Sequence, residues 1–377
     1  MEVNYNMKLT FYSNFLNHHQ LPFCIEMEKI LKDNFKFVAT EKIPIERTKM
    51  GYEDMNKKYN FVVRSYENEE EAYRLGLESD IVIIGSANQK YIRERLKHHK
   101  LTFRYSERIF KNVENLIKCM PSIIKFKLFE NNNVYLLCAS AYSSSDFNKL
   151  GLYKNKTYKW GYFPMVKKYK NINEIIEKKE ENSIIWVGRF IKYKHPENVI
   201  KIAKKLKDDN YIFTIKMIGI GKLEKKIRKQ IIKNNLENNI KLLSSMSPEK
   251  VRENMEKCEI FIFTSDRSEG WGAVLNESMN SACAVIANNE IGAVPFLIKN
   301  KENGFIYKNG NIDDLYNKVK ILLDDKETTK KIGLNAYKTI IQLWNHKIAT
   351  KRLVELSKNI MNNRKSDIYK SGPCSRA

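Results

Sequence analysis

The sequence predicts an α/β protein made of two domains, each built on a doubly wound parallel sheet. Short, continuous apolar runs such as 80–85 (DIVIIG) and 183–188 (SIIWVG) are typical of strands covered by helices on both faces. These runs alternate with amphipathic segments of helical length in both halves of the chain. The 377 residues, 42% of them hydrophobic, suit two domains of roughly 150 residues or more, each with its own core.

The first domain is expected over residues 1–165. A helix over Pro22–Asp33 fits this half because proline is tolerated in the first turn of a helix. Strands are expected at Lys8–Ser13, Phe61–Ser65, Asp80–Gly85, Leu101–Tyr105 and Val134–Ser140, and a basic helix at Gln89–Lys97.

The second domain is expected over residues 166–344, and its first part, Lys167–Asn182, is expected to be a polar, Lys-rich linker that precedes the strands. Ser247 before Pro248 is a strong signal for the start of a helix. Residues 363–377 are expected to form a disordered tail. Strands are expected at Ser183–Gly188, Tyr211–Gly219, Ile240–Leu243, Ile260–Thr264 and Ala284–Ala287, and helices at His195–Asp208, Leu223–Asn234, Pro248–Lys257, Ala273–Ala282 and about 345–362.

The net charge is the extreme feature of the composition. There are 67 Lys and Arg against 44 Asp and Glu, a formal charge of +23. This charge indicates either an anionic partner or a Lys-rich solvated surface, and composition alone leaves both open. We expect a cytoplasmic protein, because no apolar run has the roughly 18–20 residues that cross a bilayer. Reduced thiols, with no disulfide framework or zinc site, are expected from six scattered cysteines: Cys24, Cys119, Cys138, Cys258, Cys283 and Cys374.

The segment 265–279 (SDRSEGWGAVLNESM) carries the most chemistry. Glu269 and Glu277 lie on either side of a Gly-Trp-Gly turn that opens a helix. The glycines of this turn, Gly270 and Gly272, let backbone approach a ligand closely. An anion site between two carboxylates that bind hydroxyls suits a nucleotide sugar, whereas the alternative is a strand-turn-helix connection with two solvated glutamates. The backbone N–H groups expected to bind the anion are those of Gly272, Ala273 and Val274.

A second cluster follows the strand at 183–188. Arg189 and, five residues later, Lys194 place two cations at the carboxyl end of that strand, where they suit a diphosphate leaving group. Basic residues in such loops are common, so the pair gains weight only together with the two glutamates. The segment 291–305 (IGAVPFLIKNKENGF) follows a short strand and is expected to close the donor pocket, with Gly292 allowing near contact.

Taken together, residues 183–345 resemble the donor-binding domain of glycosyltransferase family 4, retaining enzymes of the GT-B fold. The resemblance rests on VGRF with Lys194, on the E-x7-E element Glu269–Glu277 around EGWG, and on the later GA-x-P and NG pieces. The first half matches less closely, through its strand-helix pattern and Gly161–Pro164. The resemblance implies two Rossmann-like domains facing a cleft, with the helix at Trp344–Ile360 crossing back to the N-terminal domain.

The resemblance also implies roles for the donor-site residues. Arg189 and Lys194 would hold the pyrophosphate and stabilise the leaving group, Glu277 would bind the ribose and Glu269 the transferred sugar. The chain has no D-x-D triplet, so we expect no metal and no cofactor beyond the nucleotide sugar, expected to be a UDP-sugar. Retention is expected through same-face attack, because no residue stands out as a nucleophile. The base is expected against the backbone near Gly219 and against the turn from Ser244 to Met246.

The first domain departs from the family pattern in two loops. The loop after the first strand reads Asn14–Gln20 without glycine, and it contains Asn17, His18 and His19. The two histidines are candidates for acceptor or phosphate contact, or for a general base, and the alternative is one exposed and one packed histidine. After the fourth strand, Ser106 and Glu107 stand where family members carry a sugar-facing histidine.

The expected function is retaining transfer of a sugar to a glycan or lipid-linked acceptor in surface polysaccharide synthesis. Two basic amphipathic stretches, Gln89–Lys100 and Lys111–Phe129, are candidates for peripheral contact with an anionic membrane, the alternative being helices packed on the sheet. Two other functions are weighed: a GT-B nucleotide-sugar epimerase, and a basic nucleic-acid-binding protein. The chain has no recognition motif for nucleic acid.

Overall fold

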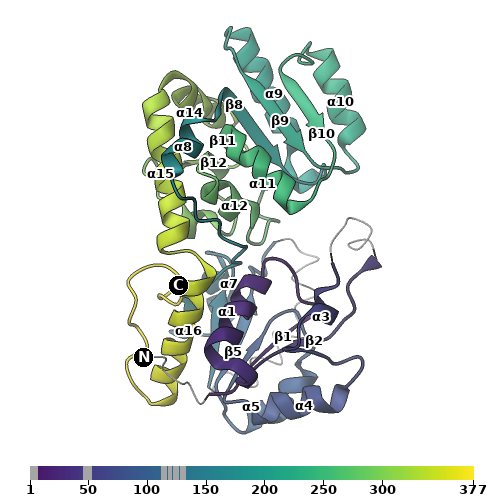
Figure 1. Ribbon diagram of the computed structural model, residues 1–377, viewed down its shortest axis with the longest axis vertical. Helices are drawn as coiled ribbons and strands as arrows, with labels where there is room; N and C mark the ends of the chain where they lie inside the picture. Colours follow the sequence, from purple (N-terminus) through teal and green to yellow (C-terminus); the bar gives the residue numbers. More distant parts are fainter. Residues whose placement is uncertain (1–6, 46–52, 112–116, 118–120, 122–126, 128–132) are drawn as a thin grey trace. The chain divides into compact units, whose positions relative to one another are not determined.

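The chain folds into two compact units, described here from a computed structural model (Figure 1). The structure describes residues 7–45, 53–111, 117, 121, 127 and 133–377. Unit 1 contains residues 1–165 and 344–377, and unit 2 contains residues 166–343. Each unit is built on one parallel sheet, so the predicted α/β class is confirmed.

The sheet of unit 1 has seven parallel strands in the order β3-β2-β1-β4-β5-β6-β7. Successive strands run outward in opposite directions from β1 and β4, which makes the carboxyl ends of these two strands the point where a doubly wound sheet binds ligands. The strands are β1 (Leu9–Ser13), β2 (Phe35–Ala39), β3 (Val62–Arg64), β4 (Ile81–Ile84), β5 (Thr102–Ser106), β6 (Val134–Cys138) and β7 (Thr157–Lys159).

Helices cover the sheet of unit 1. One core cluster joins Tyr12, Val82 and Leu136 of the sheet to Tyr91, Leu96 and Phe147 of the helices. On the opposite face Phe11 of β1 packs edge-to-face on Phe23 of α1, with ring centroids 6.2 Å apart. The helices are α1 (Leu21–Leu31), η1 (Lys32–Asn34), α3 (Met55–Lys58), α4 (Glu69–Glu78), η2 (Gln89–Ile92), α5 (Arg93–Lys97), α7 (Ser143–Asn148) and α16 (His346–Met361).

The last helix returns to unit 1, as the sequence predicted. Helix α16 packs against α1, and the two helices lie side by side in Figure 1. Asn345 caps the start of α16, because its side-chain oxygen accepts a hydrogen bond from the N–H of Ile348 at 3.1 Å. The fold expected from the family resemblance therefore includes this returning element.

The prediction of a disordered tail at 363–377 is wrong. Arg376 forms an antiparallel bridge with Tyr158 of β7. The N–H of Lys159 donates to the carbonyl of Ser375 at 2.7 Å, and the N–H of Cys374 donates to the carbonyl of Lys159 at 2.8 Å. The side chain of Cys374 is fully buried. The polar, Gly- and Pro-containing composition concealed a segment whose backbone is ordered by hydrogen bonds to a sheet edge.

The sheet of unit 2 has six parallel strands in the order β10-β9-β8-β11-β12-β13. Its direction of winding changes between β8 and β11, so their carboxyl ends mark the expected ligand edge. The register pairs Ile184 with Ile260 and Ile215, placing β8 between β11 and β9. The strands are β8 (Glu180–Val187), β9 (Thr214–Ile218), β10 (Ile240–Leu243), β11 (Cys258–Phe263), β12 (Ala284–Asn288) and β13 (Phe305–Tyr307).

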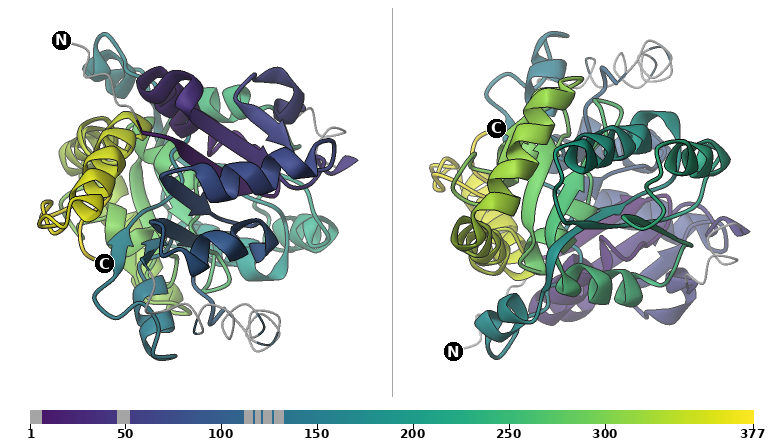
Figure 2. Two further views of the ribbon diagram at one scale, coloured as in Figure 1. Left: turned by 90° about the horizontal axis from the view of Figure 1, so that it is seen from below. Right: turned by 90° about the horizontal axis from the view of Figure 1, so that it is seen from above.

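Helices lie on both faces of this sheet (Figure 2). Alternate strand residues such as Ile184, Trp186 and Ile262 pack with Val199 and Leu315 in one core cluster, while α11, α12 and α15 contact strands of the sheet. The helices are α8 (Ile172–Glu177), η3 (Lys192–Lys194), α9 (Pro196–Asp208), α10 (Glu224–Lys233), α11 (Pro248–Lys257), α12 (Val274–Asn280), α13 (Val294–Leu297), α14 (Ile312–Asp324) and α15 (Lys326–Gln342).

The expected linker at Lys167–Asn182 is instead part of unit 2. Helix α8 occupies its middle, capped by Asn171, whose side-chain oxygen accepts from the N–H of Asn173 at 3.1 Å. Lys179 ends the segment with its ammonium on four carbonyl oxygens, including those of Cys258 at 2.8 Å and Ser281 at 2.9 Å. Lys179 therefore has a structural role, because it donates hydrogen bonds to these carbonyls. The composition of the segment 167–182 had instead predicted a linker.

The two basic stretches have different outcomes. Most of Lys111–Phe129 lies outside the described residues. In the stretch 89–100, Tyr91, Ile92 and Leu96 are buried in the core of unit 1. Arg95 is also fully buried and donates to carbonyl oxygens that include that of Asp80 at 2.7 Å. The apolar face of the stretch 89–100 is therefore covered by the protein core. Only its exposed cations, among them Lys90, Arg93 and Lys97, are available for contact with a membrane.

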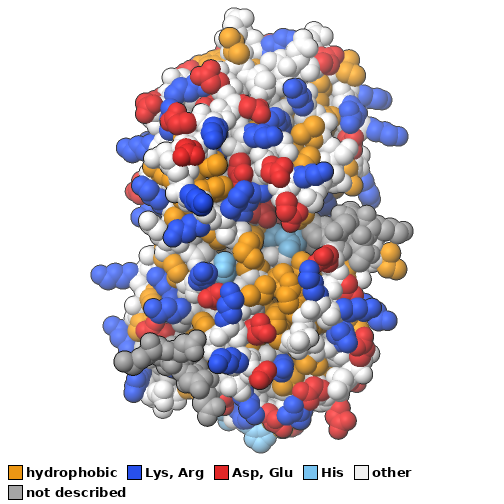
Figure 3. Space-filling view, viewed as in Figure 1, with side chains coloured by type: hydrophobic (Ala, Val, Ile, Leu, Met, Phe, Trp, Pro, Cys, Tyr) orange, Lys and Arg blue, Asp and Glu red, His pale blue; other side chains and the backbone are white. Residues whose placement is uncertain are grey.

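Charged side chains are spread over the surface. Figure 3 shows Lys and Arg interspersed with Asp and Glu on the face it displays, over both units. Among the described residues, no helix combines the length and the apolar character that crossing a bilayer requires.

Candidate functional site

The loops that follow β8 and β11 meet at the ligand edge of unit 2, because these strands are neighbours in the sheet. Lys194 of η3 forms an ion pair with Glu269 of the loop after β11. The two side chains are 12% and 13% exposed, so the pair is largely shielded from water while still reaching the surface. Lys194 and Glu269, both predicted as site residues, are 75 positions apart in the chain and form a contact in the structure.

Hydrogen bonds hold these two loops together below the ion pair. The N–H of Asp266 donates to the carbonyl of Tyr193 at 2.9 Å. The hydroxyl of Thr264 donates to the carbonyl of Lys194 at 2.5 Å and accepts from the indole N–H of Trp186 at 2.8 Å. Because Trp186 and Thr264 are buried, this chain of bonds anchors the Lys194 loop in the core.

His195 forms a further link between the same loops. Its Nε2 lies 2.9 Å from Oδ2 of Asp266, and its Nδ1 lies 2.9 Å from Oε1 of Glu197. The hydrogen bond to Glu197, reinforced by Asp266, raises the pKa of His195 above its ordinary value. Its backbone is left-handed, with φ 47° and ψ 51°, and it immediately precedes Pro196 at the start of α9.

Arg189, the other predicted cation, is exposed beside this cluster. Its Nη2 donates to the hydroxyl of Tyr193 at 3.0 Å. The ammonium of Lys194 lies 5.5 Å from the ring centroid of the same tyrosine. Tyr193 therefore contacts both predicted phosphate-binding cations.

The backbones of the loops after β8 and β9 approach each other closely at Gly219 and Gly221. A Cβ on Gly219 would lie 2.0 Å from the carbonyl oxygen of Gly188, and a Cβ on Gly221 would lie 2.5 Å from that of Phe190. The N–H of Gly188 donates to Ile218 at 3.0 Å, and that of Phe190 to Ile220 at 2.9 Å. Glycine at 219 and 221 is thus required by packing within unit 2.

The EGWG turn is held in a compact form. Gly272 has φ +87°, and a Cβ there would lie 2.6 Å from the ring of Phe263. The buried indole of Trp271 donates to Asn276 at 2.8 Å, and the carbonyl of Trp271 accepts from the N–H of Ala293 at 3.1 Å. The last bond joins the turn to the GA-x-P segment. Gly270, Gly272, Ala273 and Gly292 are buried.

Glu277 lies in α12, which begins at Val274 directly after the turn. Desolvation raises the pKa of Glu277 to about 7, and the Arg252 guanidinium opposes that shift. Arg252 donates through Nη1 to the backbone oxygen of Glu277 at 3.1 Å and to Oδ1 of Asn280 at 2.8 Å. Arg252 of α11 therefore holds the helix that presents Glu277.

The predicted base-binding residues are placed by β10. Ser244 follows this strand and is exposed, whereas Met246 is half-buried. The Asn254 side chain approaches the Met246 sulfur at 3.5 Å. Because β10 is paired with β9, Ser244 and Gly219 follow neighbouring strands at one edge of the sheet.

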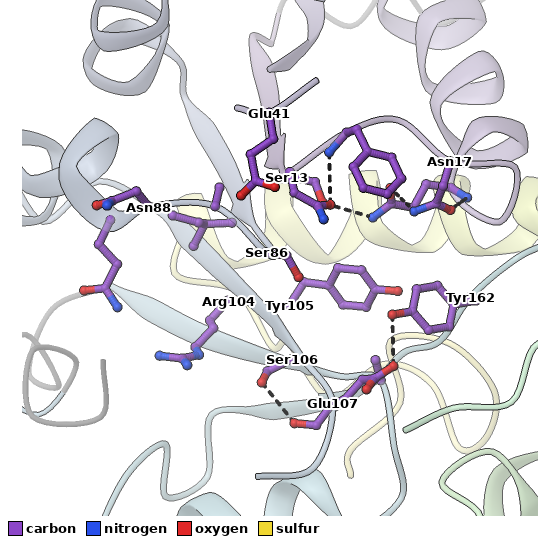
Figure 4. A pocket seen from close by; sticks show the side chains of 18 of the residues that line it. Ser13, Asn17, Glu41, Ser86, Asn88, Arg104, Tyr105, Ser106, Glu107 and Tyr162 are labelled. Atoms are coloured by element: carbon purple, nitrogen blue, oxygen red, sulfur yellow. Dashed lines mark hydrogen bonds between the residues drawn. The ribbon is translucent and has the colours of Figure 1, made fainter. Parts of the chain in front are cut away.

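Unit 1 has a pocket of about 670 Å³ at the carboxyl ends of β1, β4 and β5 (Figure 4). The site residues Asn17, Ser106 and Glu107 line it, as do Asn14, Glu41, Asn88, Arg104, Tyr105 and Tyr162. The hydroxyl of Tyr162 donates to Glu107 at 3.0 Å, and Lys111 forms an ion pair with the same carboxylate. Amide, carboxylate and aromatic side chains in one pocket suit a ligand with many hydroxyls.

The loop histidines do not belong to the lining of this pocket. The rings of His18 and His19 lie against each other, with centroids 3.7 Å apart, and His19 lies 5.9 Å from the ring of Tyr162. Asn17 shapes their turn, because its Oδ1 accepts from the N–H of His19 at 3.0 Å. The prediction that these histidines contact substrate is therefore supported only by their position in the loop after β1.

The residues missed by sequence reasoning act through partners far away in the chain. His195 and Asp266 are 71 positions apart, and no sequence motif contains both of them. Arg252 lies on a helix of otherwise solvated appearance, and Glu41 follows β2, a strand that was not predicted. The only signal for His195 was its position beside Lys194 at the end of a strand.

The comparison with protein families gives a match to unit 2. Residues 167–339 match the family described as "Glycosyl transferases group 1". An uncharacterized glycosyltransferase of Methanocaldococcus jannaschii is 30% identical over 212 residues, 56% of this chain and 55% of that protein. The poly(ribitol-phosphate) alpha-N-acetylglucosaminyltransferase of Staphylococcus aureus is 28% identical over 179 residues, 47% of this chain and 34% of that protein. The chain thus spans about half the length, or less, of these relatives.

A solved structure resembles the fold of the whole chain. HepE of Anabaena, determined in complex with UDP, has a TM-score of 0.70 at 16% identity and covers 94% of this chain and 100% of its own. This likeness confirms the two Rossmann-like sheets of the GT-B architecture. Residues 167–339, which contain Lys194, Glu269 and Glu277, match the group 1 glycosyl transferases, so the family resemblance expected for this part of the chain is confirmed over that segment.

Proposed function

We propose that this protein transfers a sugar from a UDP-sugar to a glycan or lipid-linked acceptor, without a metal ion and with retention at the anomeric carbon. The observation that carries the proposal is the shielded Lys194–Glu269 ion pair at the ligand edge of unit 2, with Arg189 exposed beside it. It combines cations for a pyrophosphate with a carboxylate for sugar hydroxyls. The UDP named in the HepE structure supports the choice of nucleotide.

The donor would bind across the loops after β8 and β11. Lys194 and Arg189 hold the pyrophosphate and stabilise the negative charge that builds on it as the sugar leaves. Glu269 accepts hydrogen bonds from hydroxyls of the transferred sugar, and it keeps Lys194 in place before the donor arrives. Glu277 binds the ribose, and the base lies along the backbone near Gly219 and the turn from Ser244 to Met246.

The acceptor would bind in the pocket of unit 1. Its carboxylates and amides, among them Glu107 and Asn88, offer hydrogen bonds to sugar hydroxyls, and Tyr105 and Tyr162 offer apolar ring surface. The acceptor named for the Staphylococcus aureus relative is poly(ribitol-phosphate), which is also rich in hydroxyls. We therefore favour a polyhydroxylated acceptor of the surface-polysaccharide class.

The reaction would follow same-face attack. The bond between the anomeric carbon and the β-phosphate oxygen breaks, and the acceptor oxygen bonds to the same face of that carbon. The departing phosphate oxygen takes the acceptor proton, so UDP leaves with that proton and the sugar keeps its anomeric configuration. The protein contributes positioning and charge stabilisation by Arg189 and Lys194.

The test is a thermal-shift and turnover screen of the full chain against UDP-glucose, UDP-N-acetylglucosamine, UDP-N-acetylgalactosamine and GDP-mannose. Binding to the folded state raises the melting temperature. We expect a UDP-sugar to raise it, Lys194→Ala to abolish the shift, and Lys192→Ala, which removes a neighbouring exposed cation, to retain it. Turnover that survives Lys194→Ala or Arg189→Ala would contradict the site, and epimerised donor formed without acceptor would favour the epimerase alternative.

The metal-free mechanism has its own test. We expect transfer to persist in excess EDTA, because Arg189 and Lys194 supply the positive charge at the leaving group. Loss of transfer in EDTA that returns with Mg²⁺ or Mn²⁺ would contradict this part of the proposal.

A further inference from the structure

His195 makes two hydrogen bonds that cannot both form on a neutral ring. Its two ring nitrogens each lie 2.9 Å from a carboxylate oxygen, of Glu197 and Asp266. An ionised carboxylate can only accept, and a neutral imidazole carries a single N–H. Both bonds are therefore made in full only when the ring is an imidazolium.

This bridge connects the start of α9 to the loop that carries Glu269. Glu197 lies in the first turn of α9, and Asp266 accepts the N–H of Glu269 at 3.0 Å through its backbone oxygen. Asp266 also accepts from the N–H of Ser268 at 2.8 Å through its side chain. His195 itself follows Lys194 directly in the chain. His195 thus links the segment that carries Lys194 to the loop that carries Glu269.

The charges around the ring are few and lie on two elements. Glu197 on α9 and Asp266 on the loop after β11 act directly on the ring. Lys201 on α9 acts on Glu197, and Lys194 and Glu269 neutralise each other beside it.

We propose that His195 is a positioning residue for the donor, which as an imidazolium bridging Glu197 and Asp266 sets the separation of the Lys194 and Glu269 loops, so that donor affinity falls when the ring loses its proton. The inference rests on the proposed function, because it takes Lys194 to be a diphosphate ligand. When the ring is neutral, one nitrogen lone pair faces a carboxylate oxygen and that side of the bridge is lost. The bridge from Glu197 to Asp266 is then incomplete, and the loops depend on the bonds of Asp266 to Tyr193 and of Thr264 to Lys194 and on the Lys194–Glu269 ion pair.

The experiment measures the dissociation constant of UDP by titration calorimetry from pH 6 to pH 9 in the full chain. The wild type is compared with His195→Asn, since asparagine tolerates left-handed backbone but does not titrate. The matched control is His99→Asn, which replaces an exposed histidine that also has a left-handed backbone, with φ +51°. The ionisation of UDP itself is common to all three proteins and cancels in the comparison.

We expect the wild type and His99→Asn to lose affinity for UDP relative to His195→Asn as pH rises, by about three- to tenfold, close to the net effect of one hydrogen bond. Asp266→Asn removes one of the charges that raise the pKa of His195. The affinity of this variant for UDP should therefore fall at a lower pH than that of the wild type. This second variant also keeps the test decisive if His195→Asn folds poorly. A packing role alone would lower stability without moving the midpoint of the pH profile.

The outcomes separate the inference from the proposed function. UDP binding with the same pH dependence in the wild type, His195→Asn and Asp266→Asn would overturn the inference alone. Failure of the wild type to bind UDP at any pH would overturn the proposed function and the inference together.

Discussion

Glu269 has two partners in turn during the proposed reaction. In the structure its carboxylate is paired with Lys194, and in the donor complex it would also accept hydrogen bonds from the transferred sugar. An ion pair shielded from water is costly to break, because removing one partner leaves the other charge poorly solvated. Substitution at this site therefore affects both loops.

Glu269→Gln separates binding of the sugar from binding of the nucleotide. We expect kcat/KM to fall by about a hundredfold, because the hydrogen bonds to the sugar that strengthen in the transition state are weakened. The affinity for UDP, which lacks the transferred sugar, should change by no more than about threefold. Steady-state kinetics and calorimetry check the two values, with the exposed Glu302→Gln as control. An unchanged kcat/KM would remove Glu269 from the proposed site.

Gly272→Ala tests the shape of the EGWG turn. A Cβ at this position would lie 2.6 Å from the ring of Phe263, and the alanine backbone would have to keep φ +87°. We expect the free energy of unfolding to fall by about 2–4 kcal/mol, from backbone strain plus overpacking. Gly310→Ala is the matched control, because Gly310 has φ +77° and open space around it. In urea denaturation, equal losses in the two variants would show that the contact with Phe263 costs nothing.

The stability of the fold should depend on His195 in a defined pH range. A raised pKa in the folded state means that the imidazolium stabilises the fold. This contribution is complete below the ordinary histidine pKa of about 6.5 and is lost as the pH rises through the raised value. We expect urea denaturation to show that the wild type exceeds His195→Asn by about 1 kcal/mol more at pH 6 than at pH 9. A constant difference would contradict the bridge.

Sequence reasoning reached those site residues that belong to local patterns. Lys194 and Glu269 could be predicted because each follows an apolar strand and because parallel strands end at the same edge. The pairing of His195 with Asp266 could not, since it depends on the left-handed backbone at 195 and on the path of a loop 71 residues later. The pocket residue Glu41 was missed because β2 (FKFVA), which precedes it, has a lysine in its centre.

At the scale of elements, composition was a poor guide at the ends of each unit. Helix α8 and the segment 363–377 are both polar, and both were expected to lack regular structure. Each is ordered by specific bonds, Lys179 to buried carbonyls in one case and Ser375 to Lys159 in the other. Most inner strands were predicted, with β2 as the exception, because burial on both faces imposes a continuous apolar run that polar edge elements do not need.

The thiol of Cys374 reports on the order of the last segment. All five described cysteines are buried, and burial raises the pKa of the Cys374 thiol well above its ordinary value. In a Cys119→Ser background, we expect no thiol of the native protein to react with Ellman's reagent within minutes at pH 8, and five to react in guanidinium chloride. One fast-reacting thiol that disappears with the additional substitution Cys374→Ser would show that the segment is disordered.

Over the whole molecule, the net charge of +23 is better explained by a Lys-rich surface than by one binding site for an anion. Many of the cations pair with carboxylates, for example Arg74 with Glu71 and Glu78. Exposed pairs of this kind contribute little stability but keep basic patches from growing. The cations assigned to a ligand are Arg189 and Lys194.

Nucleic-acid binding should accordingly be weak. We expect fluorescence anisotropy with duplex DNA or RNA at 150 mM salt to show dissociation constants no tighter than about 1 µM and no sequence preference, as for non-specific phosphate contacts. UDP should not compete with the nucleic acid. Tight, sequence-dependent binding would revive the nucleic-acid alternative.

The strand pairing of the last segment has a consequence for solubility. Strand β7 would otherwise end the seven-stranded sheet with unpaired backbone groups, which are a template for association with another chain. Residues 374–377 occupy that position, and Arg376 stacks over Tyr158 with 4.8 Å between the guanidinium carbon and the ring centroid. A chain shortened before residue 372 would expose this edge. Loss of these few residues should therefore appear first as self-association, measurable by light scattering, before it appears in catalysis.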